Sequence, residues 1–299
     1  MKRLHRYAKY LLDEGHLVFM VHGTPSPTPY PFTPFHLPVL SLLEIPQFFD
    51  RDILVVPAAM TGSIQDLVTL PCRKVILALH WDSIFDRLPK NTSLQTFNLA
   101  HIITTCQTIS DFFLITMGIG STMIRPMIDS TLYHYNAKAK RNQICHITRG
   151  NMDGKGFDSE TVLKIIFSNS DKFRTKGWTS VALSNVSEEE YAQVLRECKI
   201  FLTTSLREGA HLSMLEALAC GCHVVGYSGV TGREYQAMDK DHVLNLTLFE
   251  AGDYINIARW FTSEPLLRDP AIQSHFIHER FLPEKERQGV LNFFNRFVQ

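Results

Sequence analysis

The spacing of hydrophobic residues predicts alternating helices and strands along the chain. Residues 2–14 carry apolar side chains at helical spacing, and Gly15 ends that helix because a glycine accepts a left-handed conformation at low cost. Continuous apolar runs between such segments predict buried strands. They lie at 17–23, 51–59, 74–82, 143–150, 180–185, 199–202 and 242–247. This alternation predicts an α/β fold.

Further helices are expected at 158–169, 187–198, 253–261 and through most of 264–299. Ser187 and Glu190 have the spacing of a capping box at the start of the second of these. Residues 101–119 are predicted to form a strand, a turn and a helix that opens at Ser110 and Asp111. Residues 24–38 contain six prolines and predict a stiff loop with exposed aromatic residues.

The stretch from Thr203 to Gly226 organises the rest of the chain. It predicts the end of a strand, a charged loop, a helix capped by Ser213, a stop at Gly221, and a second strand from Val224.

Two glutamates in this stretch, Glu208 and Glu216, suggest its chemistry. The first lies on the loop and the second about one turn inside the helix. The N-terminus of a helix has free N–H groups and a partial positive charge, so it suits a phosphate. Carboxylates on either side could accept hydrogen bonds from hydroxyls. A nucleotide sugar has this layout of ribose, diphosphate and sugar.

At these residues the sequence resembles the retaining family 4 glycosyltransferases of the GT-B fold. Their signature is Glu, seven residues and Glu, followed by a helix of small residues, a glycine and Val-Val. Here it spans Glu208 to Val225. The resemblance implies two Rossmann-like domains that face a cleft, with a reduced N-terminal domain. We expect an acceptor-side domain at 1–140, a nucleotide-sugar-binding domain at 141–270, and helices at 271–299 that return to the first domain.

The resemblance also implies roles for individual residues. Glu208 would hold the sugar and Glu216 the ribose, while the N–H groups around Leu212 and Ser213 would face the diphosphate. The remaining candidates are Arg149 and Lys155 for the diphosphate and His80 for the donor sugar. Two cations on a glycine-containing loop after a strand also suit a phosphate on physical grounds alone. A solvated basic loop and a core histidine remain the alternatives.

Other segments match the family less closely. Residues 123–129 match a strand that leads to an Asp before the interdomain linker, here 130–142, and 227–235 match a glycine-rich turn before Glu234. The family's first strand and glycine-rich loop have no counterpart before residues 2–14. The family's Gly-Phe-Gly is replaced by Gly209, Ala210 and His211, which puts an imidazole where the family keeps bare backbone.

Length and composition bear on the number of domains, on nucleic-acid and zinc binding, and on localisation. The 299 residues suit two domains, and 30 basic against 30 acidic residues give no support for nucleic-acid binding. Six cysteines without a CxxC pair favour free buried thiols over zinc. No signal peptide or spanning segment is recognised, so we expect a cytoplasmic protein. The final helix could pack on the domain or rest its basic and aromatic residues on the inner face of the membrane.

We therefore expect a retaining, metal-independent glycosyltransferase without a cofactor, whose donor is a nucleoside-diphosphate sugar. The acceptor could be a glycan, a lipid or a protein, and the base uridine, guanosine or adenosine. One alternative is a non-catalytic protein that binds nucleotide sugars or scaffolds a partner. Another is a different sugar-nucleotide enzyme on this fold, such as an epimerase.

Overall fold

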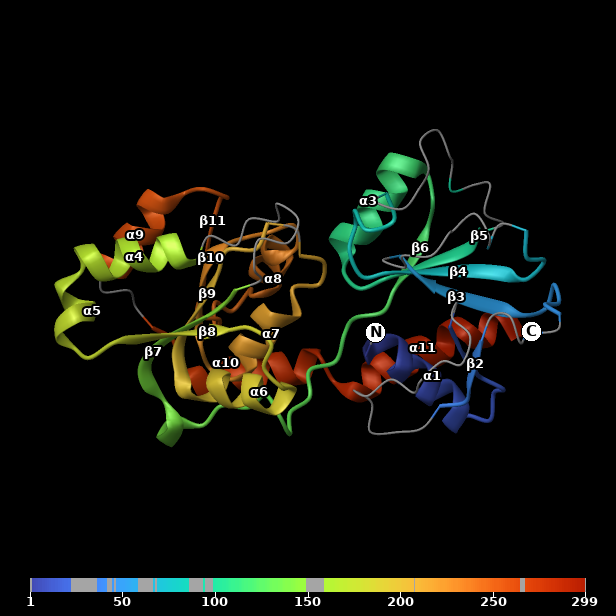
Figure 1. Cartoon of the computed structure of the whole chain (residues 1–299), viewed down its shortest axis with the longest axis horizontal. Coiled ribbons are helices and arrows are strands. Elements are labelled where there is room, and N and C mark those ends of the chain that lie inside the picture. Colours follow the sequence, from blue (N-terminus) through green and yellow to red (C-terminus); the bar gives the residue numbers. More distant parts are fainter. Residues whose placement is uncertain are drawn as a thin grey trace. The chain divides into compact units, whose positions relative to one another are not determined.

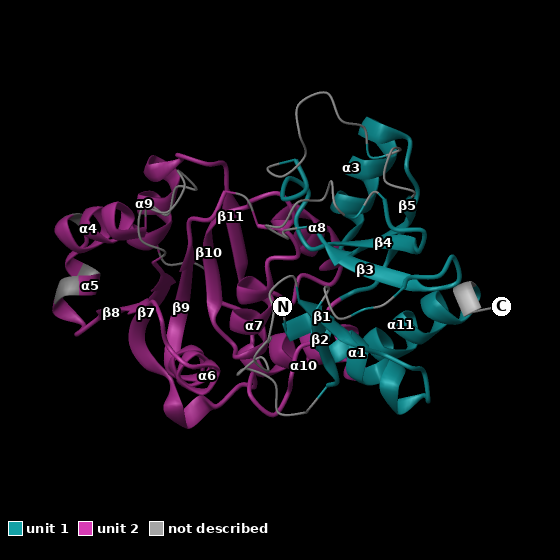
Figure 2. Cartoon of the chain, turned by 45° about the vertical axis from the view of Figure 1, so that its right-hand side comes forward, with its two compact units in different colours: residues 1–125, 284–299 teal, residues 126–283 magenta. Residues whose placement is uncertain are grey.

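The fold is given by a computed structural model that describes residues 2–22, 37–41, 45, 47–58, 67, 69–85, 94, 99–148, 159–206, 208–263 and 267–298. The chain forms two compact units, coloured separately in Figure 2: Met1–Arg125 with Glu284–Gln299, and Pro126–Pro283. Residues 126–140 and 271–283, which the sequence assigned elsewhere, are thus part of the second unit. The predicted proline-rich loop lies outside the described residues except for 37–38.

The first unit contains a parallel sheet with the strand order β3-β4-β5-β6 and a separate parallel pair, β1-β2. The strands are β1 (Met20–His22), β2 (Val39–Ser41), β3 (Ile53–Pro57), β4 (Arg73–Ala78), β5 (Leu99–Thr104) and β6 (Ser121–Met123). The helices are α1 (Lys2–Asp13), α3 (Gln107–Met117) and α11 (Pro283–Val298).

Helices cover both faces of the four-stranded sheet (Figure 1). Ile109 and Phe113 of α3 pack on one face, and α1 and α11 pack on the other. Phe293 and Phe294 of α11 are 3% and 5% exposed, and they pack between this helix, α1 and the sheet. These two aromatic residues are therefore core residues, as the packed-helix interpretation predicts, and they do not form a membrane-facing surface. No described helix is both long and apolar enough to cross a membrane.

A buried carboxylate joins α11 to α1. Glu286, whose side chain is fully buried, accepts hydrogen bonds from Arg6 Nε at 2.5 Å and Arg6 Nη2 at 2.9 Å. Arg3 Nε lies 3.5 Å from the same carboxylate. Burial lowers the pKa of Arg6, but the hydrogen bond to Glu286 and the negative charge of that carboxylate together outweigh burial, so the pKa is raised overall. A buried charge of this kind is tolerated because it is paired.

The second unit is a five-stranded parallel sheet with the order β11-β10-β9-β7-β8. The strands are β7 (Arg141–Ile147), β8 (Thr179–Leu183), β9 (Cys198–Thr203), β10 (His223–Tyr227) and β11 (Leu246–Phe249). The helices are α4 (Ser159–Asn169), α5 (Asp171–Thr175), α6 (Glu188–Glu197), α7 (Leu212–Ala219), α8 (Gly232–Met238), α9 (Tyr254–Thr262) and α10 (Pro270–Arg280).

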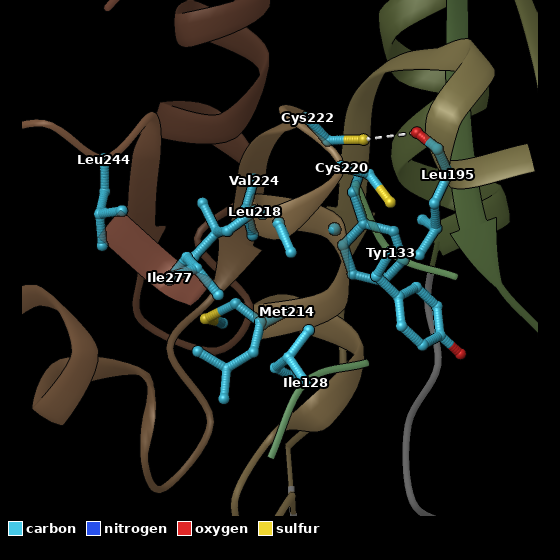
Figure 3. Packing of buried hydrophobic residues seen from close by; sticks show 14 of the residues in the cluster. Ile128, Tyr133, Leu195, Met214, Leu218, Cys220, Cys222, Val224, Leu244 and Ile277 are labelled. Atoms are coloured by element: carbon cyan, nitrogen blue, oxygen red, sulfur yellow. Dashed lines mark hydrogen bonds between the residues drawn. The ribbon is translucent and has the colours of Figure 1, made fainter. Parts of the chain in front are cut away.

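This sheet is also covered on both faces, as in a doubly wound fold (Figure 1). One cluster joins the strands to α4, α5 and α9, and the other joins them to α6, α7 and α10. Figure 3 shows part of the second cluster, where Met214 and Leu218 of α7 meet Ile277 of α10. Helix α7 is therefore held along its length by the core.

A buried group of cysteines lies at the same face. The thiol of Cys222 donates to the carbonyl oxygen of Leu195 at 3.1 Å (Figure 3), and Lys140 Nζ lies 3.5 Å from its sulfur. Burial raises the pKa of the Cys222 thiol, but hydrogen bonding to Cys145 and the charge of Lys140 outweigh this and lower it to about 7. All six cysteines are buried and free, in agreement with the preferred interpretation of the sequence.

Two predicted element boundaries are wrong. Helix α3 begins at Gln107 rather than at Ser110, whose hydroxyl instead lies 2.5 Å from that of Thr104 at the end of β5. Residues 124–129 do not form the expected strand, and only Ser121–Met123 pair with β5. Pro126, which lacks an N–H donor, follows directly after the point where the units divide.

Candidate functional site

The candidate site lies at the topological switch point of the second sheet. The chain passes from β7 to β8 on one side and then returns to place β9 on the other side of β7. Ligands in open α/β sheets bind beyond the carboxyl ends of the strands at such a point. A recess is found there. It is lined by Ile147, Phe201, Leu202, Thr203, Thr204, Ser205, Glu208, His211 and Ser213.

Glu208 is held at this recess by the end of β9. Its Oε1 accepts a hydrogen bond from Ser205 Oγ at 2.9 Å, and the side chain is half-buried. The carboxylate is thus oriented but still accessible to a ligand hydroxyl.

His211 forms the junction between the loop and α7. It is the N-cap residue of the helix, with φ 40° and ψ 55°, and only 2% of it is exposed. A left-handed conformation is uncommon for a residue other than glycine, although histidine is among the types enriched there. It costs of order 1 kcal/mol. Such outliers often occur at functional sites.

Ser213 does not cap α7, and that prediction is wrong. The helical conformation begins at Leu212, so Ser213 is the second residue of the helix, and the N-cap residue is His211, whose side chain makes no capping hydrogen bond. Its hydroxyl instead lies 3.3 Å from Nδ1 of His211. The predicted stop at Gly221 is confirmed, with φ 76° and a Cβ position only 2.5 Å from the Tyr135 ring.

Thr231 and helix α8, which follows it, hold the loop between Glu208 and Glu216 in place. Thr231 Oγ1 donates to the carbonyl oxygen of Gly209, and the hydroxyl of Tyr235 donates to that of Ala210. These bonds fix the backbone of the loop at Gly209 and Ala210.

Glu216 does not line the recess with Glu208. It lies four residues into α7, about 6 Å along the helix axis from Leu212. Burial, followed by the negative charge of Glu216, raises the pKa of both Tyr133 and Tyr191. The charge of Glu216 therefore acts on these two tyrosines.

The remaining predicted residues are placed as follows. Leu212 begins α7 and is 37% exposed, and His80 follows β4 in the first unit, where it is half-buried. Arg149 and Lys155 lie outside the described residues. The segment that carries them is flanked by a buried contact in which His146 Nδ1 lies 2.8 Å from Ser159 Oγ. That contact joins the end of β7 to the start of α4.

Sequence reasoning missed the polar residues that support the loop, namely Thr203, Thr231 and Tyr235. The replacement of glycine by His211 was the available signal, because a side chain introduced there needs partners. Within the described residues, no group of three or more His, Cys, Asp or Glu side chains is arranged to hold a metal ion.

Comparison with known proteins identifies this arrangement. Residues 180–268 match the family model described as glycosyl transferases group 1. The chain has the GT-B fold, and residues 180–268 are similar to the group 1 glycosyltransferases. The matched segment includes β9, α7 and the whole span from Glu208 to Glu216.

Individual relatives agree with this. An alpha-1,6-glucosyltransferase of Actinobacillus pleuropneumoniae serotype 7 is 45% identical over 51 residues, which is 17% of this chain and 16% of that protein. The pneumococcal O-GlcNAc transferase GtfA, solved with UDP and GlcNAc, is similar with a TM-score of 0.56 and 11% identity. The alignment covers 84% of this chain and 57% of that chain, so this chain spans little more than half the length of that protein.

The sucrose-phosphate synthase of Thermosynechococcus elongatus is similar over nearly its full length. Its TM-score is 0.63 at 14% identity, with 98% of this chain and 92% of that chain covered. At this level of identity the similarity establishes the fold.

Proposed function

We propose that this protein transfers a sugar from a nucleoside-diphosphate sugar to an acceptor hydroxyl, with retention of the anomeric configuration and without a metal ion. The observation that carries the proposal is the recess at the switch point, where Glu208 and the first turn of α7 lie together. Negative charge develops on the leaving diphosphate during transfer. Fixed N–H donors and cations at that position would stabilise the transition state.

Each predicted residue has a role in this proposal. The N-terminal turn of α7, with Arg149 and Lys155, would hold the diphosphate in place of a metal ion. Glu208 would bind sugar hydroxyls, and Glu216 the ribose. His80 would contribute from the first unit, as the family resemblance implies. We propose a UDP-linked sugar as the first donor to test, since the pneumococcal relative was solved with UDP.

The first experiment is thermal unfolding of the protein with UDP-, GDP- and ADP-linked sugars. A ligand present at 100 times its dissociation constant raises the free energy of unfolding by about 2.7 kcal/mol. For a unit of this size the unfolding midpoint should rise by about 5–10 °C. Loss of that shift in Glu208→Ala and Glu216→Ala, with Glu189→Ala as an exposed control, would support the site.

Turnover is tested with the donor that responds. Transfer to an acceptor, or slow hydrolysis of the donor with retained configuration, supports the enzyme. Binding without either product would favour a donor-binding module, and release of an altered sugar without an acceptor would favour an epimerase. A protein that responds to no nucleotide sugar would overturn the proposal.

A further inference from the structure

His211 connects the two elements that form the recess. Its Nε2 lies 3.0 Å from the hydroxyl of Thr203 at the end of β9, and its Nδ1 lies 3.3 Å from the hydroxyl of Ser213 in the first turn of α7. The ring is buried and Thr203 is 4% exposed, whereas Ser213 is partly exposed at the recess. A polar relay therefore runs from the core to the ligand side.

The backbone of His211 fixes the same turn. Its carbonyl oxygen accepts hydrogen bonds from the N–H groups of Met214 at 3.0 Å and Leu215 at 3.4 Å. Its left-handed conformation directs the chain from the loop into the helix. A glycine would adopt this conformation without strain, so the conformation alone does not explain a histidine at this position. The two hydroxyl contacts of the ring do.

A neutral imidazole has one donor nitrogen and one acceptor nitrogen, whereas a hydroxyl can donate and accept at once. If Thr203 donates to Nε2, Nδ1 carries the proton and donates to Ser213 Oγ. The hydroxyl proton of Ser213 is then free to donate toward the recess. The opposite tautomer would use that proton on the ring and would present only an oxygen lone pair to an anion.

We infer that His211 is a positioning residue that aims the Ser213 hydroxyl at the distal phosphate of the nucleoside diphosphate. The inference rests on the proposed function, and it adds a residue that the family keeps as glycine. The ring itself need not touch the ligand. Its effect is to fix, through Thr203, which way the proton of Ser213 points.

The binding test compares nucleotides that differ by the distal phosphate. Affinities for UDP and UMP, with GDP–GMP and ADP–AMP in parallel, are measured by calorimetry on the full chain. His211→Gly should lower the ratio of diphosphate to monophosphate affinity by about tenfold, as expected for one charge-assisted hydrogen bond. Ser213→Ala should do the same, and the double variant should add little more.

Two further variants separate this role from folding. His242→Gly removes the other left-handed histidine, φ 51°, at an exposed position outside the recess, and should leave the ratio unchanged. His211→Asn should restore part of the ratio, because asparagine accepts the left-handed conformation and can place an amide donor near the position of Nδ1.

A second measurement does not need a ligand. Nitrogen-15 NMR of the imidazole should show the proton of His211 on Nδ1, and Thr203→Val should release it to the other tautomer. An Nε2–H tautomer in the wild type, or an unchanged affinity ratio in His211→Gly, would overturn this inference alone. A wild type that binds none of the nucleotides would overturn the proposed function and the inference together.

Discussion

Gly226 in β10 lies directly against the backbone of the neighbouring strand in the second unit. It pairs with Thr203 of β9, and its φ is 140°. A Cβ added there would lie 1.7 Å from the carbonyl oxygen of Thr203, whereas real Cβ contacts essentially never fall below 3.0 Å. Gly226→Ala therefore requires a displacement of at least 3.0 − 1.7 = 1.3 Å. That is roughly a quarter of the ordinary ~4.8 Å spacing between strands.

The cost follows from what this displacement breaks. Loss of about two ladder hydrogen bonds at ~1 kcal/mol each, with a strained backbone at ~1–2 kcal/mol, gives about 3–4 kcal/mol. For a unit of 158 residues, counted from 126 to 283, this lowers the unfolding midpoint by about 10–15 °C. Because Thr203 moves, the affinity for nucleotide should fall as well.

Gly252→Ala is the matched control. Gly252 has φ 81° in the same unit, and nothing lies within 4 Å of its Cβ position. In this variant an alanine must adopt the strained backbone conformation, but its Cβ meets no neighbouring atom. We therefore expect the free energy of unfolding to fall by about 1 kcal/mol. Urea and thermal unfolding of both variants measure the difference. If the two variants lose the same free energy within about 1 kcal/mol, the reasoning from strand contact is refuted.

Two further predictions concern buried charge. Glu286→Gln should destabilise the first unit by about 3–5 kcal/mol in urea unfolding, because buried arginine charges lose their partner. Glu284→Gln, exposed on the same helix, should cost less than about 1 kcal/mol, and equal losses would contradict the first prediction. Since the pKa of Cys222 is lowered to about 7 from 9.0, the free energy of unfolding should rise between pH 7 and pH 9 and lose this gain as the pH falls through 7. Cys222→Ser should abolish this rise, whereas Cys220→Ser should retain it, because the pKa of Cys220 is raised; identical pH profiles for the two variants would count against the assignment.

The local features that the sequence predicted correctly are those with a short-range signature. These are the position of Glu216 inside α7, the stop at Gly221, and the capping box of Ser187 with Glu190, each of which depends on residues within one or two turns. Local patterns of this kind predict the structure correctly because the backbone geometry that they require involves only neighbouring residues.

The parts that the sequence missed depend on contacts between distant segments. Ser110 and Ser213 both have the residue type of a helix cap, but each has its hydroxyl placed by another side chain, Thr104 in one case and His211 in the other. The support of the Gly209–Ala210 backbone by α8 likewise depends on residues more than twenty positions away. Such pairings follow from strand order, which a single sequence does not specify.

The discontinuous first unit has a consequence for the order of folding during synthesis. Its core includes Val290, Leu291, Phe293 and Phe294 together with strands that are made some 200 residues earlier. The second unit is continuous from 126 to 283 and can close its own core as soon as it leaves the ribosome. The first 125 residues of this chain must therefore wait, with the sheet face that α1 and α11 share only partly covered, until residues 284–299 arrive. The usual N-to-C order of domain folding is reversed.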